Sequence, residues 1–240
     1  MPEPLFYLAA FAAEIFGTLA GFGSSTIFLP LALFFVDFPT ALILVALFHV
    51  FGNLGRITFF REGINWKLLL WFGVPSIILT AVGAILVRKI SLPVLEGVLG
   101  IFLMLFSIIS FLKPKFSLPK NKKSIITGGI LSGFFAGLIG TGGALRGAFL
   151  ASFHLKKNIY IATLAVIALV VDFTRIPIYL GSGFLQREFY GTLPWLLLVA
   201  VLGAFAGKKL VDKIPQELFR KLVLAAILVM GVWLLWGIVS

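Results

Sequence analysis

The chain alternates between long apolar runs and short polar segments, and the apolar runs occupy most of its length. A transmembrane helix needs about 20 consecutive apolar residues to cross the hydrocarbon core of a bilayer. Runs of about this length or longer cover residues 38–60, 68–87, 92–112, 159–180, 189–206 and 218–239. Little sequence remains for a soluble domain, so the pattern predicts an all-α polytopic membrane protein.

A further apolar run, residues 5–36, contains the glycine-rich stretch GFGSS at residues 21–25. As one helix these 32 residues would be about 48 Å long. That length exceeds the roughly 30 Å hydrocarbon core unless the helix tilts strongly. We therefore expect a re-entrant hairpin that bends at the glycines and returns to the side from which it entered. A broken helix that still spans the bilayer is the alternative.

The same pattern recurs 119 residues later, where GTGG occupies residues 140–143 (140 − 21 = 119). This offset aligns Gly21 with Gly140, Gly23 with Gly142, Leu31 with Leu150, Phe34 with Phe153, Asn53 with Asp172, Arg56 with Arg175, Ile57 with Ile176 and Pro75 with Pro194. Arg and Pro are rare in membrane spans, so their coincidence outweighs that of matched leucines; chance similarity among apolar residues is the alternative. The predicted organisation is one membrane domain with repeats 1–112 and 124–240 and a basic linker, 113–123.

The distribution of Lys and Arg distinguishes the hairpin from a full span, because cytoplasmic loops collect these residues. With four full spans in each half, nine fall on one side and eight on the other, which gives no orientation. With a re-entrant first segment, fourteen fall on one side and three, Arg88, Lys89 and Arg187, on the other. We therefore predict two inverted repeats, each a re-entrant glycine-broken helical hairpin followed by three transmembrane helices. The termini would lie outside and the linker 113–123 in the cytoplasm.

Composition narrows the class further. The chain is 60% hydrophobic and 12% charged, with a mean hydropathy of +1.13, so it belongs in a lipid bilayer. Its net charge of +11 comes from short loops between apolar spans and does not indicate nucleic acid as a partner. The chain has no Cys, and its two histidines, His49 and His154, are isolated. We therefore expect no cofactor, no metal site and no enzymatic activity.

The two glycine breaks form the predicted substrate site. Short helices over residues 24–36 and 143–155 would begin near the membrane centre with their N-termini facing each other. A helix N-terminus offers free N–H groups and about half a positive charge, so it attracts anions, and a guanidinium group binds oxyanions in bidentate fashion. The predicted ligand is a small anion, and the predicted substrate-binding residues are Gly21, Gly23, Ser24, Ser25, Thr26, Gly140, Thr141, Gly142, Gly143 and Arg146. Close helix packing at the glycines is the alternative.

Polar residues inside the span 38–60 form a second group of candidates. His49, Asn53 and Arg56 lie at i, i+4 and i+7, on one face of a helix. Ionisable groups inside a membrane are costly and by default indicate a substrate pathway or a proton relay, and histidine titrates near neutral pH. We expect these three residues to gate the site or couple ions. A packed imidazole, and an Arg56 that extends to the inner interface, are the structural alternatives.

Three further ionisable residues lie in apolar runs. Asp172 and Arg175, at i and i+3, can pair on one helix face, and Glu14 has no partner nearby in the sequence. We expect all three to take part in gating or ion coupling, with protons as the candidate coupling ion through Glu14 or His49. A purely structural ion pair and a neutral, hydrogen-bonded carboxyl group are the alternatives.

The glycine motifs resemble those of the sulfite exporter TauE/SafE family, also called toluene sulfonate uptake permeases. Its two halves each open with a G-x-G-G-type break followed by Pro and Leu. GFGSSTIFLPL at residues 21–31 keeps the glycines and Pro30 but has Ser24 where the family often has glycine, and GLIGTGGALRGAFL at residues 137–150 has Phe149 in place of the proline. The resemblance implies a multi-pass inner-membrane protein that moves sulfite or organosulfonates, often as an exporter driven by an ion gradient.

Together these observations predict a secondary transporter of small sulfur-containing anions that works by alternating access in the cytoplasmic membrane. A passive anion channel, an uptake permease for another small organic anion, and a membrane assembly scaffold are the alternatives. The predicted partners are the anionic substrate, the lipid bilayer and protons.

Overall fold

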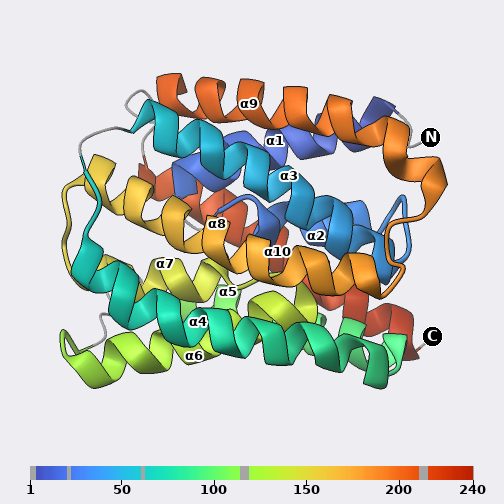
Figure 1. Cartoon of the computed structure of the whole chain (residues 1–240), viewed down its shortest axis with the longest axis horizontal. Coiled ribbons are helices and arrows are strands. Elements are labelled where there is room, and N and C mark those ends of the chain that lie inside the picture. Colours follow the sequence, from blue (N-terminus) through green and yellow to red (C-terminus); the bar gives the residue numbers. More distant parts are fainter. Residues whose placement is uncertain (1–3, 21–22, 61–62, 114–118, 211–215, 240) are drawn as a thin grey trace.

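The computed structural model describes residues 4–20, 23–60, 63–113, 119–210 and 216–239, and these residues form helices and no β-strand. The first half contains α1 (Pro4–Ala20), α2 (Ser25–Ala32), α3 (Phe38–Phe59), α4 (Trp66–Leu86), the short 3-10 helix η1 (Val87–Lys89) and α5 (Leu92–Leu112). The second half contains α6 (Lys122–Ile139), α7 (Gly143–Ala151), α8 (Lys157–Gly181), η2 (Arg187–Thr192), α9 (Leu193–Leu210) and α10 (Gln216–Val239). Each half is a long helix, a short helix and three long helices, in that order (Figure 1).

Polar caps set the starts of several helices. Asp37 accepts a hydrogen bond from the Thr40 N–H (3.1 Å) at the start of α3, and Asn65 accepts one from the Leu68 N–H (3.0 Å) at the start of α4. Such side chains satisfy N–H groups that have no partner within the helix. The caps explain why these helices begin directly after polar loop residues.

The two short helices end earlier than the sequence predicts. α2 stops at Ala32 and α7 at Ala151, whereas the apolar pattern continues to residues 36 and 155. After Ala32 the backbone tightens, with the Phe34 N–H bonded to the Leu31 carbonyl (3.3 Å). α6 begins at Lys122, so the last two residues of the predicted linker are helical.

The helix ends gather at two ends of the molecule (Figure 1). In that view α1, α3, α5 and α9 begin at the right, and α4, α6, α8 and α10 begin at the left. Hydrogen bonds join neighbouring helix ends at the left, where the Asn65 N–H donates to Thr163 Oγ1 (3.0 Å) and Lys208 Nζ to the Phe59 carbonyl (2.5 Å). α1 and α3 therefore start at one end, and α6 and α8 at the other.

Five helical segments are long and apolar enough to cross a membrane: Phe38–Phe59, Trp66–Lys89, Leu92–Leu112, Lys157–Gly181 and Arg187–Leu210. The described part of α10 adds a shorter apolar segment, Lys221–Gly237. α1 has only 17 residues, and the glycine-rich α6 does not qualify either. Within the described ranges the protein is thus all-helical with several candidate spans, as the sequence predicts.

The two halves pack across each other. α1 of the first half contacts α9 of the second, and the corresponding helix of the second half, α6, contacts α4 of the first. The pairs α3 with α8, α5 with α10 and α2 with α7 join equivalent helices. Every one of these contacts between halves has its counterpart when the halves are exchanged, which is the pattern of an approximate two-fold relation.

Glycines allow the helices to approach closely. On α6, Gly129, Gly133 and Gly137 repeat every fourth residue and face the backbone of α4. An ideal Cβ on Gly137 would lie only 2.1 Å from the Thr80 carbonyl oxygen. The hydroxyl of Ser76 donates to the Gly129 carbonyl (3.0 Å) across the same interface. Small residues at a four-residue spacing and hydroxyl bonds between helices are typical of contacts inside membranes.

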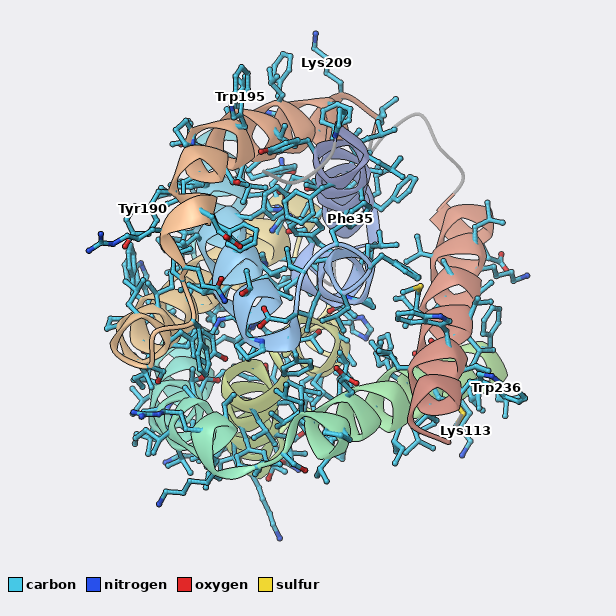
Figure 2. The ribbon with its side chains drawn as sticks, turned by 90° about the vertical axis from the view of Figure 1, so that its right-hand side faces the viewer. Phe35, Lys113, Tyr190, Trp195, Lys209 and Trp236 are labelled. Carbon is cyan, nitrogen blue, oxygen red and sulfur yellow. The ribbon has the colours of Figure 1, made fainter. Side chains whose placement is uncertain are left out.

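The outer surface of the bundle is apolar, whereas its central helices are buried. Residues Ala41–Ala46 of α3 are fully buried, so this part of the helix is surrounded by protein on all sides. Trp195 and Trp236 lie on the outside of the bundle, as Figure 2 shows. Exposed apolar side chains along α4, α5, α9 and α10 suit contact with lipid.

Candidate functional site

A small cavity lies where the turn between α1 and α2 meets α3, α7 and α8. Its lining residues are Gly17, Thr18, Gly23, His49, Asn53, Arg56, Gly143, Arg146, Ile161, Leu164, Ala165 and Ala168. The space open to a water-sized sphere is about 20 Å³, which suits about one water molecule. The polar lining side chains come from α1, α3 and α7, whereas α8 contributes only apolar ones.

The two glycine breaks meet beside this cavity. Gly23 has a positive φ of 83°, and its N–H bonds to the Gly17 carbonyl (3.3 Å), so the chain folds back onto α1. Gly140, with φ 71°, ends α6 in the left-handed conformation that favours glycine. The Thr141 hydroxyl donates to Thr26 Oγ1 (2.8 Å), which joins the second break to the start of α2. The sequence expectation that the two breaks face each other agrees with this contact.

Arg56 is the centre of the polar network in the first half. Its Nε donates to Thr18 Oγ1 (3.0 Å) and its Nη1 to Asn53 Oδ1 (2.8 Å). Its Nη2 donates to Glu14 Oε1 (2.5 Å) and to Ser24 Oγ (3.4 Å). Arg56 is buried, so it does not extend to an interface, and Glu14 has the partner that its sequence neighbourhood lacks.

Two glycines make room for Glu14 inside the bundle. An ideal Cβ on Gly52 of α3 would lie 2.5 Å from Glu14 Oε1, and one on Gly203 of α9 would lie 2.7 Å from Glu14 Cβ. The carboxylate is completely buried. The α1–α3–α9 contact is therefore shaped around the Glu14–Arg56 ion pair.

Arg175 holds the end of α6 in the second half. Its Nε and Nη2 donate to Asp172 Oδ1 (2.9 and 2.8 Å), which confirms the predicted pairing. Its Nη1 donates to the carbonyls of Ala136 and Gly140 (2.9 Å each), and Tyr179 Oη donates to the Gly137 carbonyl (2.6 Å). A cation is favourable at a helix C-terminus, where carbonyl groups lack partners. Arg175 and Tyr179 thus stabilise the second break by donating hydrogen bonds to the carbonyl groups at the end of α6.

Asp172 also reaches across to the first half. Its Oδ2 lies 2.8 Å from His49 Nδ1. His49 Nε2, on the other side of the ring, is buried and has no hydrogen-bond partner. His49, Asp172 and Arg175 therefore form one chain of contacts that links α3 to α8.

The two arginines occupy equivalent positions but are neutralised differently. Arg56 and Arg175 are related by the 119-residue offset, and so are Asn53 and Asp172. The first half receives its carboxylate from Glu14 on α1, whereas the second half receives it from Asp172 on α8 itself. Each arginine therefore has one carboxylate partner.

Among the described residues, Arg146 has no such partner. It lines the cavity from α7, its side chain is 3% exposed, and its Nε makes no hydrogen bond. The buried charged residues among those described are Glu14, Arg56, Arg146, Asp172 and Arg175. When His49 is neutral, these three guanidinium groups and two carboxylates leave a net charge of +1. The described carboxylates that are buried already pair with other arginines.

The predicted site residues fall into three sets. Those that line the cavity are Gly23, His49, Asn53, Arg56, Gly143 and Arg146. Those that surround it, through contacts with lining residues or as parts of the two breaks, are Glu14, Ser24, Ser25, Thr26, Gly140, Thr141, Gly142, Asp172 and Arg175. Gly21 lies outside the described residues.

Sequence reasoning missed two polar contributors, Thr18 and Tyr179. Thr18 follows Glu14 by four residues and Tyr179 follows Arg175 by four, so helical spacing could have found both. The apolar wall from α8 carries no comparable signal, because its residues resemble any other apolar helix face. No group of three or more metal-ligating side chains occurs among the described residues.

Comparison with known proteins agrees with this architecture. The profile of the family described as sulfite exporter TauE/SafE matches residues 6–234. The chain is 27% identical to a probable membrane transporter protein of Methanocaldococcus jannaschii, over 97% of this chain and 95% of that protein. A comparison with solved structures found no significant match. The chain therefore belongs to the sulfite exporter TauE/SafE family and is a multi-pass membrane transporter.

Proposed function

We propose that this protein is a secondary transporter that exports small sulfur-containing anions, such as sulfite or organosulfonates, across the cytoplasmic membrane by alternating access. The central cavity between the two breaks, which must widen from its one-water size to admit such an anion, is its substrate site. The observation that carries this proposal is Arg146, a buried guanidinium that lines the cavity and forms no ion pair with a carboxylate among the described residues.

The physical argument rests on the cost of an uncompensated buried charge. Removing a charge from water is unfavourable by several kcal/mol unless an opposite charge and hydrogen bonds replace the water. Arg146 presents donors that match the oxygen atoms of sulfite or a sulfonate. Gly143, the first residue of α7, lines the cavity one turn before Arg146, where the helix N-terminus also favours an anion. An anion would complete the charge balance of the site.

We further propose that the halves are inverted repeats and that each glycine break is the tip of a re-entrant hairpin. The exchange pattern of helix contacts supports this arrangement, as does the start of α1 and α3 at one end and of α6 and α8 at the other (Figure 1). Most Lys and Arg residues outside the core belong to the left end in Figure 1, where α3, α5 and α9 end. By the positive-inside rule that end is cytoplasmic and the termini are outside.

In this mechanism the residues around the cavity act as gates. When contacts on one side of the site hold the halves together, substrate can reach the site only from the other side. The Thr26–Thr141 hydroxyl contact joins α2 to α7, and the His49–Asp172 contact joins α3 to α8. Arg56 and Asn53, with Arg175 on the other half, keep the two breaks in place as the halves move. Breaking and remaking contacts between halves would expose the cavity alternately.

Flux of sulfite and of methanesulfonate into proteoliposomes, with and without a pH gradient, tests the proposal. Arg146→Ala is expected to weaken substrate affinity about 10- to 100-fold, because a hydrogen-bonded charge contributes about 1.5–3 kcal/mol. Arg187→Ala, at an exposed position of η2, is the matched control and is expected to retain wild-type affinity.

Equal effects of the two substitutions would remove Arg146 from the substrate site. Electrical conductance without saturable, gradient-coupled flux would identify a passive channel. Absence of any anion flux by the wild-type protein would refute transport of this class of substrate.

A further inference from the structure

His49 presents an unused ring nitrogen to the cavity. The residue is 2% exposed, and its Nε2 is buried without a hydrogen-bond partner. An ideal Cβ on Gly23, another lining residue, would lie 3.0 Å from this nitrogen. The absence of a side chain at Gly23 therefore leaves space beside His49 Nε2.

Asp172 fixes which ring nitrogen carries the proton in the neutral imidazole. A carboxylate only accepts hydrogen bonds, so Nδ1, 2.8 Å from Asp172 Oδ2, is the nitrogen that donates. Nε2 of the neutral ring is then an acceptor and points a lone pair at the cavity. An anion oxygen placed there would be repelled by neutral His49. A proton on Nε2 converts the same atom into a charged donor.

The charges around His49 link this proton to the anion. Asp172 and Arg175 face it from α8, Arg56 lies on its own helix, and Arg146 shares the cavity from α7. From α1, Glu14 is already paired with an arginine. In an empty cavity a second uncompensated cation beside Arg146 is unfavourable. A bound anion removes that penalty, so anion and proton each favour binding of the other.

We propose, on the basis of the proposed function, that His49 is the second side-chain donor of the anion site. In this proposal His49 binds one proton with each anion. The proton is taken up at Nε2 when the anion enters and is released when the anion leaves. Asp172 and Arg175 act as positioning residues for the ring.

The packing of Glu14 distinguishes it from His49, the other proton carrier that the sequence predicts. Glu14 Oε1 is held by Arg56, and the carboxylate fills the space beside Gly52 and Gly203. Glu14 does not line the cavity, whereas His49 does. The coupling proton is thereby assigned to His49.

Calorimetric titration of the purified full-length protein with methanesulfonate tests the inference. This probe stays ionised near neutral pH, so any proton uptake belongs to the protein. Titrations in two buffers of different ionisation enthalpy, at about pH 6 and about pH 8, give the number of protons bound with each anion. For one proton, affinity falls by up to about tenfold per pH unit as the pH rises.

Two variants assign the proton to a residue. His49→Gln replaces the imidazole with an amide that can hydrogen-bond but cannot titrate, so its binding is expected to lose proton uptake and become independent of pH. His154→Asn removes the other histidine of the chain, at an exposed position with φ 48° that Asn tolerates, and is expected to keep the wild-type pH profile.

The outcomes separate this inference from the proposed function. Wild-type protein that binds methanesulfonate through Arg146 without proton uptake overturns the role of His49 alone, even if His49→Gln does not fold. Wild-type proton uptake that persists in His49→Gln also overturns it. Wild-type protein that binds no sulfonate and carries no sulfite refutes the proposed function itself.

Discussion

The buried Glu14–Arg56 pair gives a quantitative prediction about stability. Glu14→Gln keeps the shape of the side chain but leaves Arg56 without a counter-charge inside the bundle. Removal of one partner of a buried pair costs about 3–5 kcal/mol. At about 2–4 °C for each kcal/mol in a chain of this size, the melting temperature falls by about 6–20 °C. Thermal unfolding in detergent, followed by the fluorescence of the five tryptophans, measures this change.

An exposed ion pair and a double variant control this experiment. Glu217 and Lys221 form a solvent-exposed pair at 3.2 Å on α10, and Glu217→Gln is expected to leave the melting temperature unchanged. Adding Arg56→Met to Glu14→Gln removes the uncompensated charge and is expected to recover part of the lost stability. Equal melting temperatures for the two single Gln variants would refute the reasoning. A double variant no more stable than Glu14→Gln would show that the cost does not arise from the arginine.

Two glycine substitutions test the close contacts of the fold. Gly137→Ala places a Cβ 2.1 Å from the Thr80 carbonyl and is expected to lower stability by about 1–3 kcal/mol, whereas Gly181→Ala, with open space around it, is expected to have no such effect in the same melting assay. Gly23→Ala combines strain at positive φ with intrusion into the cavity, so it is expected to reduce both melting temperature and anion affinity. Gly63→Ala, also at positive φ but with no atom within 4 Å of the added Cβ, is expected to lower only the melting temperature. Loss of anion affinity in both the Gly23 and the Gly63 variants would show that backbone strain, not intrusion into the cavity, causes the loss.

Local sequence patterns were sufficient to predict most of the helices. Glycine breaks in long apolar runs predicted the interruptions after α1 and α6, because backbone that leaves a helix at membrane depth must be buried or line a cavity. The 119-residue offset places the start of α3 at Phe38 in register with the start of α8 at Lys157. The Asp172–Arg175 pair also followed from helical spacing.

Contacts between segments far apart in the sequence could not be predicted from these patterns. Glu14 and Arg56 are 42 residues apart, and His49 and Asp172 are 123 residues apart and belong to different halves. Helical periodicity shows which face a residue occupies but not which helix packs on that face. For this reason the sequence could single out Arg146 as a buried cation, whereas only the packed structure shows that both buried carboxylates described here are already paired with other arginines.

The cross-packing of the halves also constrains how the protein is made. The ribosome completes Glu14 early, but the glycine surface of α9 that covers it, at Gly203, is synthesised only when most of the chain has left the exit tunnel. Until then α1 lacks its final neighbour. In the same way, α4 is synthesised before α6, the helix that packs against it. We therefore expect neither half to reach its final packing before α9 has been made. Two halves expressed as separate polypeptides should assemble only when both are present in the same membrane.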